Sequence, residues 1–451
     1  MNRCRVVALI LLLASQAGYF AMKMFPHEFL GLLAVYSAAF LCFGVLALCL
    51  KRGQNGPGHG PSMALSVVII AGIVARLIVL FSPPVLENDF HRYLWDGRVL
   101  ANGVNPYLYS PMDPALDFLD TDYREKIGWK KYGTIYPPLA QIVFAGSHLF
   151  FGDSLIGLKI IFLLFDLGTG FVLVRWLRSK EIDPSWSFLY FLNPLVLREI
   201  GNAAHLDSIP VFFSTLSLYL MSRTKNQKPL WAWISLALGV TSKLFPIVLA
   251  PLLVRVDPKW KQNASCFLGV VALMYLPFMG AGSGLFGGAG AYAQYWIWNA
   301  SVFKILSLGS AWVGTNISTI FHSDWIKAAI ERDAPAKLIV GIIFAIILFR
   351  IAKNLKKRID LPVAAFWTLS ALLILSPVMD GWYVLWILPL ACLLRSKSWI
   401  AFSYLVVASY AWFYSKEIAP YFRIVEYALF FTLLYWEYFR LKRRSGVGLP
   451  I

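Results

Sequence analysis

The chain has 451 residues, of which 59% are hydrophobic and only 14% are charged, whereas an ordinary soluble chain is about 25% charged. This composition excludes a large soluble catalytic domain. The formal net charge of +17 could indicate nucleic acid, but the basic residues cluster at the ends of apolar runs, which is the positive-inside pattern of membrane proteins. We therefore expect one membrane domain over residues 1–451, in contact with the lipid bilayer and with no nucleic acid.

Apolar runs long enough to cross about 30 Å of hydrocarbon recur along the whole chain. They cover residues 6–22, 28–50, 63–82, 155–177, 264–281, 336–353, 399–414 and 421–439. The basic clusters beside them include Arg3 and Arg5, Lys51 and Arg52, Arg175 and Arg178, Arg223 and Lys225, Lys356 to Arg358, and Arg440 to Arg444. Together these runs predict an all-α polytopic protein with about 11–13 transmembrane or half-spanning helices.

With the N-terminus inside, the loop 51–62 is cytoplasmic and the third run ends outside. Residues 83–137, rich in charged and aromatic side chains, then form a long first outer loop. A loop of this length is usually functional or disordered, and its aromatic content argues against disorder. The apolar stretch 139–152 that follows is too short to span comfortably, so we predict an interfacial or re-entrant helix.

Three later regions, 186–222, 230–254 and 362–394, are apolar but interrupted midway. The interruptions read NPLVLREIGNAAHLD (193–207), GVTSKLFP (239–246) and SPVMDGWY (376–383). Broken helices at membrane depth survive only where the freed backbone lines a cavity or is buried in protein. We expect three hairpins whose tips carry polar groups to a common cavity on the outer side.

The densest group of polar residues, 87–98, follows the third apolar run. On a helix, four of its residues fall on one face at i, i+3, i+4 and i+7, namely Asp89, Arg92, Tyr93 and Asp96. A carboxylate there could accept a proton from a hydroxyl while an arginine contacts a phosphate. The alternative is a surface helix with internal ion pairs worth about 0.2–0.5 kcal/mol each, and the spacing does not decide between the two.

Charged residues inside the interrupted regions form a second set of candidates. Glu199, His205 and Asp207 make an acidic cluster, although the spacing is a poor metal signature. Lys243 has no acidic neighbour in sequence, and an intramembrane lysine needs a partner, for which a ligand phosphate is one candidate. A lysine that snorkels to the interface is the other interpretation.

Aromatic residues supply a third set. Tyr107 follows a turn signal and either shapes the outer loop or lines a sugar groove. Trp382 and Tyr383, beside Asp380, either line the cavity or serve as interfacial aromatics. The sequence has no nucleotide-binding loop, no GxGxxG fingerprint and no nucleophile elbow, so a donor would have to come from the membrane itself.

The motifs and their order along the chain resemble those of the type C glycosyltransferases (GT-C) that use polyprenyl-phosphate sugars. The nearest likeness is to mannosyltransferases related to the first mannosyltransferase of GPI-anchor synthesis and to bacterial alpha-mannosyltransferases of envelope glycans. It spans roughly residues 60–395 and is carried by an acidic pair in the outer loop, RYxWDGRVLANGVNPY (92–107), YPP (136–138), NPL with a following Glu and HLD (193–207), SKLFP (242–246), and SPV with WYVLW (376–386).

The resemblance implies roles for particular residues. Asp89 would be the general base that activates the acceptor hydroxyl, and Glu87 would position the acceptor or a divalent ion. The residues that would bind the donor phosphate or sugar are Arg92, Arg98, His205, Asp207 and Lys243. Tyr93, Asp96, Tyr107, Glu199, Trp382 and Tyr383 would line the cavity. The sequence requires no cofactor. Glu87-x-Asp89 is an ExD motif, and Mg²⁺ or Mn²⁺ could bind to its two carboxylates.

The expected reaction is transfer of a sugar, with mannose the first choice, from a polyprenyl-phosphate donor to an acceptor hydroxyl by a single inverting displacement. The acceptor would be a glycan, a lipid or a protein. The active site would face outside from a bacterial inner membrane, or lie in the ER membrane of a eukaryote. A lipid-linked-sugar flippase or a secondary transporter is the alternative, because it would also have broken helices and intramembrane charge.

Overall fold

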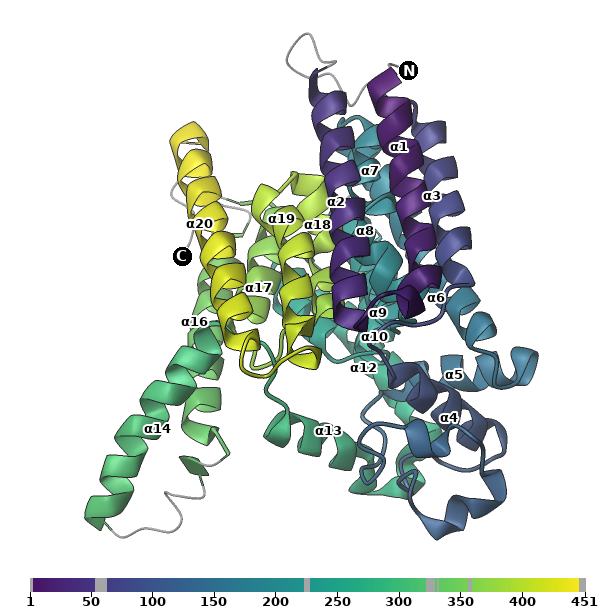
Figure 1. The fold of residues 1–451 in the computed structure, drawn as a ribbon. Helices are drawn as coiled ribbons and strands as arrows, with labels where there is room; N and C mark the ends of the chain where they lie inside the picture. Colours follow the sequence, from purple (N-terminus) through teal and green to yellow (C-terminus); the bar gives the residue numbers. More distant parts are fainter. Residues whose placement is uncertain are drawn as a thin grey trace.

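The computed structural model describes residues 3–52, 63–222, 228–321, 329–330, 332–355 and 359–445. The described chain is built of helices that run side by side (Figure 1). It contains no β-strand in these ranges, only two isolated bridges, Trp298–Val378 and Leu355–Ile359. The predicted all-α class is therefore confirmed. The loop residues 53–62 and the basic clusters at 223–225 and 356–358 lie outside the described residues.

Five helical segments of 21 to 25 residues are long and apolar enough to cross a membrane. At a rise of about 1.5 Å per residue, the shortest of them covers about 30 Å. They confirm five of the predicted runs and show a polytopic integral membrane protein. The segments are α1 (Arg3–Gln16) continued by η1 (Ala17–Met24), α2 (Glu28–Arg52), α6 (Leu155–Ser179), α12 (Trp260–Tyr275) continued by η7 (Leu276–Ala281), and α16 (Ala334–Asn354).

Several apolar helices are shorter than a full span. The predicted runs 63–82 and 139–152 appear as α3 (Leu65–Leu80) and α5 (Pro138–Phe151). Helix α5 begins with Pro138 because the first helical position has no use for the N–H that proline lacks. Its 14 residues reach only about 21 Å, and its re-entrant placement stays a prediction.

The three interrupted regions break where the sequence predicts. The first contains α8 (Pro194–Val196), a π-helical turn η5 (Leu197–Asn202) and α9 (Ser208–Ser222). The second runs from α10 (Pro229–Val240) to η6 (Phe245–Leu249) and α11 (Ala250–Val256). The third contains α17 (Leu361–Leu375), η8 (Gly381–Trp386) and α18 (Leu388–Leu394). A π-turn is rare and occurs mainly at functional sites, which directs attention to residues 197–202.

The long outer loop is folded and lies at the end of the bundle opposite the N-terminus (Figure 1). It contains α4 (Asp89–Ala101), η2 (Pro114–Leu119) and η3 (Arg124–Lys126). The loop has its own apolar cluster, made of Trp95, Val99, Leu116, Leu119 and Ile127. This cluster packs α4 against the rest of the outer loop.

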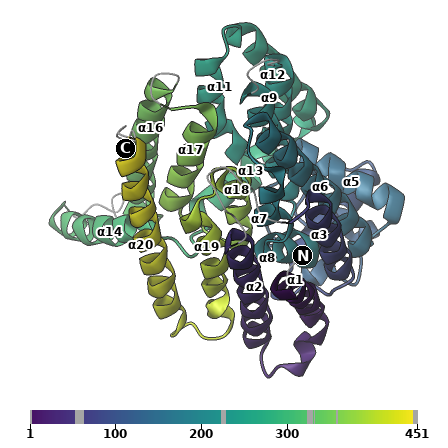
Figure 2. The same cartoon turned by 90° about the horizontal axis from the view of Figure 1, so that it is seen from above.

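The remaining helices complete the bundle. Seen from above, α14, α16 and α20 lie on one side and α5 and α6 on the other, with α18 between them (Figure 2). The elements not yet given are η4 (Pro184–Ser187), α7 (Phe188–Phe191), α13 (Gly284–Tyr295), α14 (Val302–Phe321), α19 (Lys397–Leu405), η9 (Val406–Phe413) and α20 (Ala419–Ser445).

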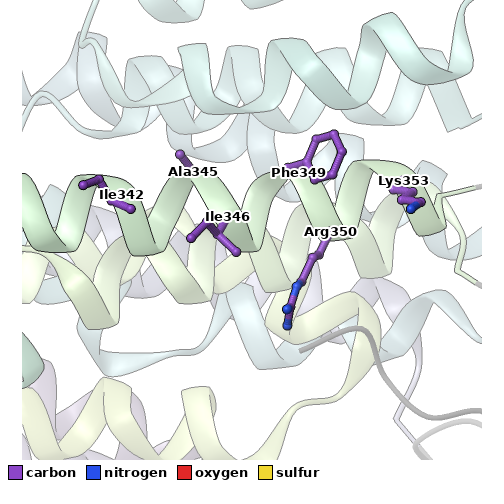
Figure 3. A pocket seen from close by; sticks show the side chains of 6 residues that line it. All are labelled: Ile342, Ala345, Ile346, Phe349, Arg350 and Lys353. Atoms are coloured by element: carbon purple, nitrogen blue, oxygen red, sulfur yellow. The ribbon is translucent and has the colours of Figure 1, made fainter.

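A shallow surface depression runs along α16 (Figure 3). Its lining comes from that helix alone and consists of Ile342, Ala345, Ile346, Phe349, Arg350 and Lys353. An apolar face on a membrane helix, with basic side chains at one end, is suited to lipid chains and their headgroups. None of the predicted site residues belongs to it.

Candidate functional site

Glu87, just before α4, is joined to the first interrupted region by ionic and hydrogen bonds. Arg198 Nη1 donates to Glu199 Oε2 at 2.6 Å and to Glu87 Oε1 at 3.3 Å. The Tyr410 hydroxyl of η9 donates to Glu87 Oε1 at 2.7 Å and itself lies 2.5 Å from Arg198 Nη1. Two carboxylates thus share one guanidinium, which is the ionised partner that carboxylates accept most strongly.

His205 lies beside the same two carboxylates and is fully buried. Its Nε2 is 3.5 Å from Glu87 Oε1 and 3.4 Å from Glu199 Oε2, and neither ring nitrogen has a hydrogen-bond partner within the described ranges. The imidazole stacks on Trp382 with ring centroids 3.9 Å apart. Glu87, Glu199 and His205 each offer one ligand atom, all within 4.8 Å of one another, and so could hold a metal ion.

The backbone around this cluster is held in uncommon conformations. Leu86, next to Glu87, has φ 53°, and Ala204, next to His205, has φ 61°. The left-handed region costs a residue with a Cβ about 1–2 kcal/mol, so the surroundings must hold it. Asn202 does so, because its amide accepts from Val85 N at 3.2 Å and donates to Pro83 O at 2.6 Å.

The third interrupted region approaches the cluster through a glycine. A Cβ on Gly381 would lie 2.2 Å from Glu199 Oε1, so no other residue fits there without displacing the carboxylate. This close approach brings Asp380 and Trp382 to the site. It explains why the break in that region contains glycine.

Lys243, at the second interruption, forms an ion pair with Asp207. Its Nζ lies 2.8 Å and 2.9 Å from the two carboxylate oxygens, and Trp386 Nε1 donates to Asp207 Oδ1 at 2.6 Å. The ammonium also faces the Tyr383 ring at 5.0 Å, a favourable cation–π distance. The lysine side chain is 20% exposed, so it is not sealed from a ligand.

Asp89 and Asp380 are half-buried, and their carboxylates make no hydrogen bond or ion pair with any residue that the structure describes. Burial raises the pKa of Asp89 above its ordinary value, and His205 and Lys243 only partly offset this. Burial also opposes ionisation of Glu87, but His205 and Arg198 hold the pKa of Glu87 below its ordinary value. Two neighbouring carboxyls therefore differ, and Asp89 is the more basic.

Arg92 and Asp96 lie on the buried side of α4. Arg92 Nε donates to Asp96 Oδ1 at 2.7 Å, the i, i+4 pair that the surface-helix alternative anticipates. The other Asp96 oxygen accepts from Thr134 Oγ1 at 2.6 Å and from Gln141 Nε2 at 3.1 Å. Arg92 is thereby bonded to Asp96 and not to Asp89, and the network fixes α4 to α5.

Three further predicted residues also hold the outer loop together. Arg98 Nη1 donates to Asp153 Oδ2 at 2.7 Å. Tyr93 packs in the aromatic core under α4, and the Tyr107 hydroxyl donates to Tyr136 O at 2.7 Å. The structure does not bring these three side chains into contact with the Glu87 cluster.

The sequence reasoning missed Arg198, Trp386 and Tyr410. A signal for Arg198 was present, because an arginine directly before Glu199 inside an interrupted apolar region is costly unless it is paired. Trp386 stands in the WYVLW motif, which was noted only for its first two residues. Tyr410 lies in an ordinary apolar run and carries no local signal.

Comparison with known proteins gives a consistent result. A family model described as alpha-(1->6)-mannopyranosyltransferase, N-terminal domain, matches residues 7–258. The chain is 24% identical over 347 residues to alpha-(1->6)-mannopyranosyltransferase B of Corynebacterium glutamicum, covering 69% of this chain and 56% of that protein. It is 21% identical over 336 residues to alpha-(1->6)-mannopyranosyltransferase A of Mycobacterium tuberculosis, covering 69% and 62%. The matches thus span less than two thirds of the relatives' length.

Proposed function

Because this chain belongs to the alpha-(1->6)-mannopyranosyltransferase family, we propose that it transfers mannose from a polyprenyl-phosphate donor to an acceptor hydroxyl in an α-(1→6) linkage. The acceptor is a glycan, lipid or protein that reaches the membrane surface. The observation that carries the proposal is the free Asp89 carboxylate beside the cationic groups of the interrupted helices. Asp89 supplies a base, and the cationic side chains beside it supply positive charge for the donor phosphate.

Asp89 is the general base of the proposed reaction. It accepts the proton of the acceptor hydroxyl, and the oxygen attacks the anomeric carbon from the face opposite the lipid phosphate. The bond from that carbon to the phosphate oxygen breaks, and its electron pair leaves with the polyprenyl phosphate. A single displacement inverts the anomeric centre, so a β-linked donor gives an α-mannoside. The raised pKa of Asp89 suits a base that works near neutral pH.

Lys243 stabilises the leaving phosphate. Its ammonium is already oriented by Asp207 and by the Tyr383 ring, so little reorganisation accompanies the change in charge. Preorganised positive charge of this kind often contributes more to catalysis than any other single effect. The polyprenyl tail remains in the bilayer, and Asp207 and Trp386 position the lysine.

The proposed site faces away from the cytoplasm. Helix α4 lies at the end of the bundle opposite the N-terminus and the end of α20 (Figure 1). The basic residues Arg3 and Arg5 stand at the N-terminal end, which the positive-inside rule assigns to the cytoplasm. The relatives are bacterial proteins, so we assign the chain to a bacterial inner membrane. The donor is thus a lipid that has crossed that membrane before it reacts.

The test uses full-length protein in proteoliposomes with radiolabelled polyprenyl-phosphate mannose and a mannoside acceptor. We expect acid-stable mannosylated product that an α-(1→6)-specific mannosidase removes. The Asp89→Asn variant should make little product, while Asp153→Asn, which alters a carboxylate outside the cluster, should transfer normally. Movement of the donor across the bilayer without any product would support the flippase alternative and refute the proposal.

A further inference from the structure

We propose that Glu87, Glu199 and His205 bind one divalent transition-metal ion. The three residues come from two distant segments. Glu87 lies 111 positions before Arg198, the residue next to Glu199. Their ligand atoms lie within 4.8 Å of one another. His205 Nε2 is nearly equidistant from the two carboxylate oxygens, at 3.5 Å and 3.4 Å. Ligand atoms on a common ion, each about 2.0–2.2 Å from it, are separated by distances of this order.

The state of His205 points to a missing partner. The ring is 0% exposed, yet neither nitrogen makes a hydrogen bond within the described chain. A buried polar group without a partner costs about 1–3 kcal/mol. The stack on Trp382, with ring centroids 3.9 Å apart, holds the ring in this orientation. A cation between the imidazole and the carboxylates would satisfy the nitrogen that faces them.

The charge of the cluster leaves room for the ion. Two carboxylates face a single guanidinium, because Arg198 bonds both Glu87 and Glu199. Glu87 Oε1 also accepts from Tyr410, but a carboxylate has about four lone-pair sites. A histidine that binds a metal ion gives up its proton, and with the imidazole neutral the four groups carry one net negative charge. A divalent ion would make the cluster positive.

The donor set selects the class of ion. Oxygen donors alone would suit Mg²⁺, Ca²⁺ or Mn²⁺, whereas an imidazole beside two carboxylates shifts the preference to Zn²⁺ or Fe²⁺, with Mn²⁺ still accepted by the oxygens. The site therefore differs from the Mg²⁺ or Mn²⁺ at Glu87 and Asp89 that the ExD motif suggests. Asp89 stays outside the ligand set and remains free as a base. The purpose of the ion rests on the proposed function, because added positive charge here would favour an anionic donor.

The binding experiment measures the ion and not the reaction. Full-length protein in detergent is stripped with a chelator, dialysed against Mn²⁺ or Zn²⁺, and desalted. Bound metal is counted by mass spectrometry, and bound Mn²⁺ is followed by electron paramagnetic resonance. We expect one ion per chain, and a loss of affinity of at least about 10-fold on His205→Gln or Glu199→Gln.

The variants are chosen to separate binding from folding. His205→Gln removes no hydrogen bond, whereas Glu199→Gln weakens the partner of Arg198, so thermal unfolding is measured for both. Glu426→Gln is the matched control, because Glu426 is a buried carboxylate that is bonded to Asn299 elsewhere in the bundle. This control should bind metal as the native protein does.

Either of two results would overturn the inference: no retained ion, or an affinity unchanged by His205→Gln in a folded variant. In the second case His205 would serve as a protonated partner of the two carboxylates instead. If the protein gives either result but still transfers mannose, the inference fails while the proposed function stands. A bound ion with no product would do the reverse.

Discussion

The chain buries two kinds of ionic group, and they differ in how completely the protein satisfies them. In the bundle, Arg76 Nε donates to Asp166 Oδ2 at 2.5 Å and Nη1 to Phe191 O at 2.8 Å, while the Tyr190 hydroxyl donates to Asp166 Oδ1 at 2.8 Å. At the candidate site, Lys243 stays 20% exposed and Asp89 has no partner in the described ranges.

The contrast separates scaffold from chemistry. Asp166 is bonded on both oxygens and fully buried, so a substrate does not reach it, and losing it strands a buried charge. A half-buried carboxylate without a partner makes no contact that stabilises the fold, so replacing it should not lower the stability. Under the proposed function, it is retained because it acts on the substrate. Activity and stability should therefore respond to different residues.

The largest expected effect is on activity. Asp89→Asn should lower mannosyl transfer by about 10²–10⁴-fold, the usual contribution of a general base. Its melting temperature should stay within about 2 °C of the native protein, because Asp89 has no bonded partner to lose among the described residues, and a change that breaks no specific contact is worth at most about 0.5 kcal/mol. The proteoliposome assay and a thermal melt check both parts. Near-native transfer would remove Asp89 from the mechanism.

Asp166→Asn should produce the opposite pattern. It leaves the Arg76 charge buried without an anion, which costs about 3–5 kcal/mol. Thermal unfolding in detergent should show a clearly lower midpoint, while the protein that remains folded transfers mannose at the native rate per molecule. An unchanged midpoint would contradict the comparison.

A smaller effect is expected at the lysine of the site. Lys243→Met keeps the length of the side chain but removes the charge, so kcat/KM for the donor should fall about 10- to 100-fold, as for the loss of a bond worth about 1.5–3 kcal/mol. Lys243→Arg is the control and should recover part of this loss. If the methionine variant matched the native enzyme, Lys243 would only neutralise Asp207.

Arg98→Ala should have the smallest effect. The pair with Asp153 is partly exposed, with side chains 28% and 24% accessible, and such pairs contribute about 0–1 kcal/mol. Transfer should stay within about threefold of the native rate. A loss like that of Lys243→Met would show that the donor phosphate reaches the outer side of α4.

Much of the architecture could be predicted because it depends on local hydrophobicity. The long apolar runs and the three breaks follow from residue type along the chain, and so does the concentration of charge at Glu199, Asp207 and Lys243. Helical spacing also placed Asp89 and Asp96 on one face of α4. Spacing does not say which members of a face pair, and Arg92 reaches Asp96 instead of Asp89.

The rest of the site depends on contacts between distant segments. Arg198 and Tyr410 are 212 positions apart, and the partners Lys243 and Asp207 come from different interrupted regions. Periodicity within a window of about 11–18 residues carries no information on such pairs. The close approach of Gly381 to Glu199 is equally invisible until both segments are placed in space.

The bond between Tyr410 and Glu87 has a consequence for the order in which the protein is made. The two residues are 323 positions apart, so a nascent chain inserts its outer loop and most of its spanning helices long before the tyrosine emerges from the ribosome. Until then Glu87 lacks the hydroxyl that donates to it. Under the proposed function, the catalytic centre is thus completed among the final events of biogenesis, and a stalled translation product would be inactive.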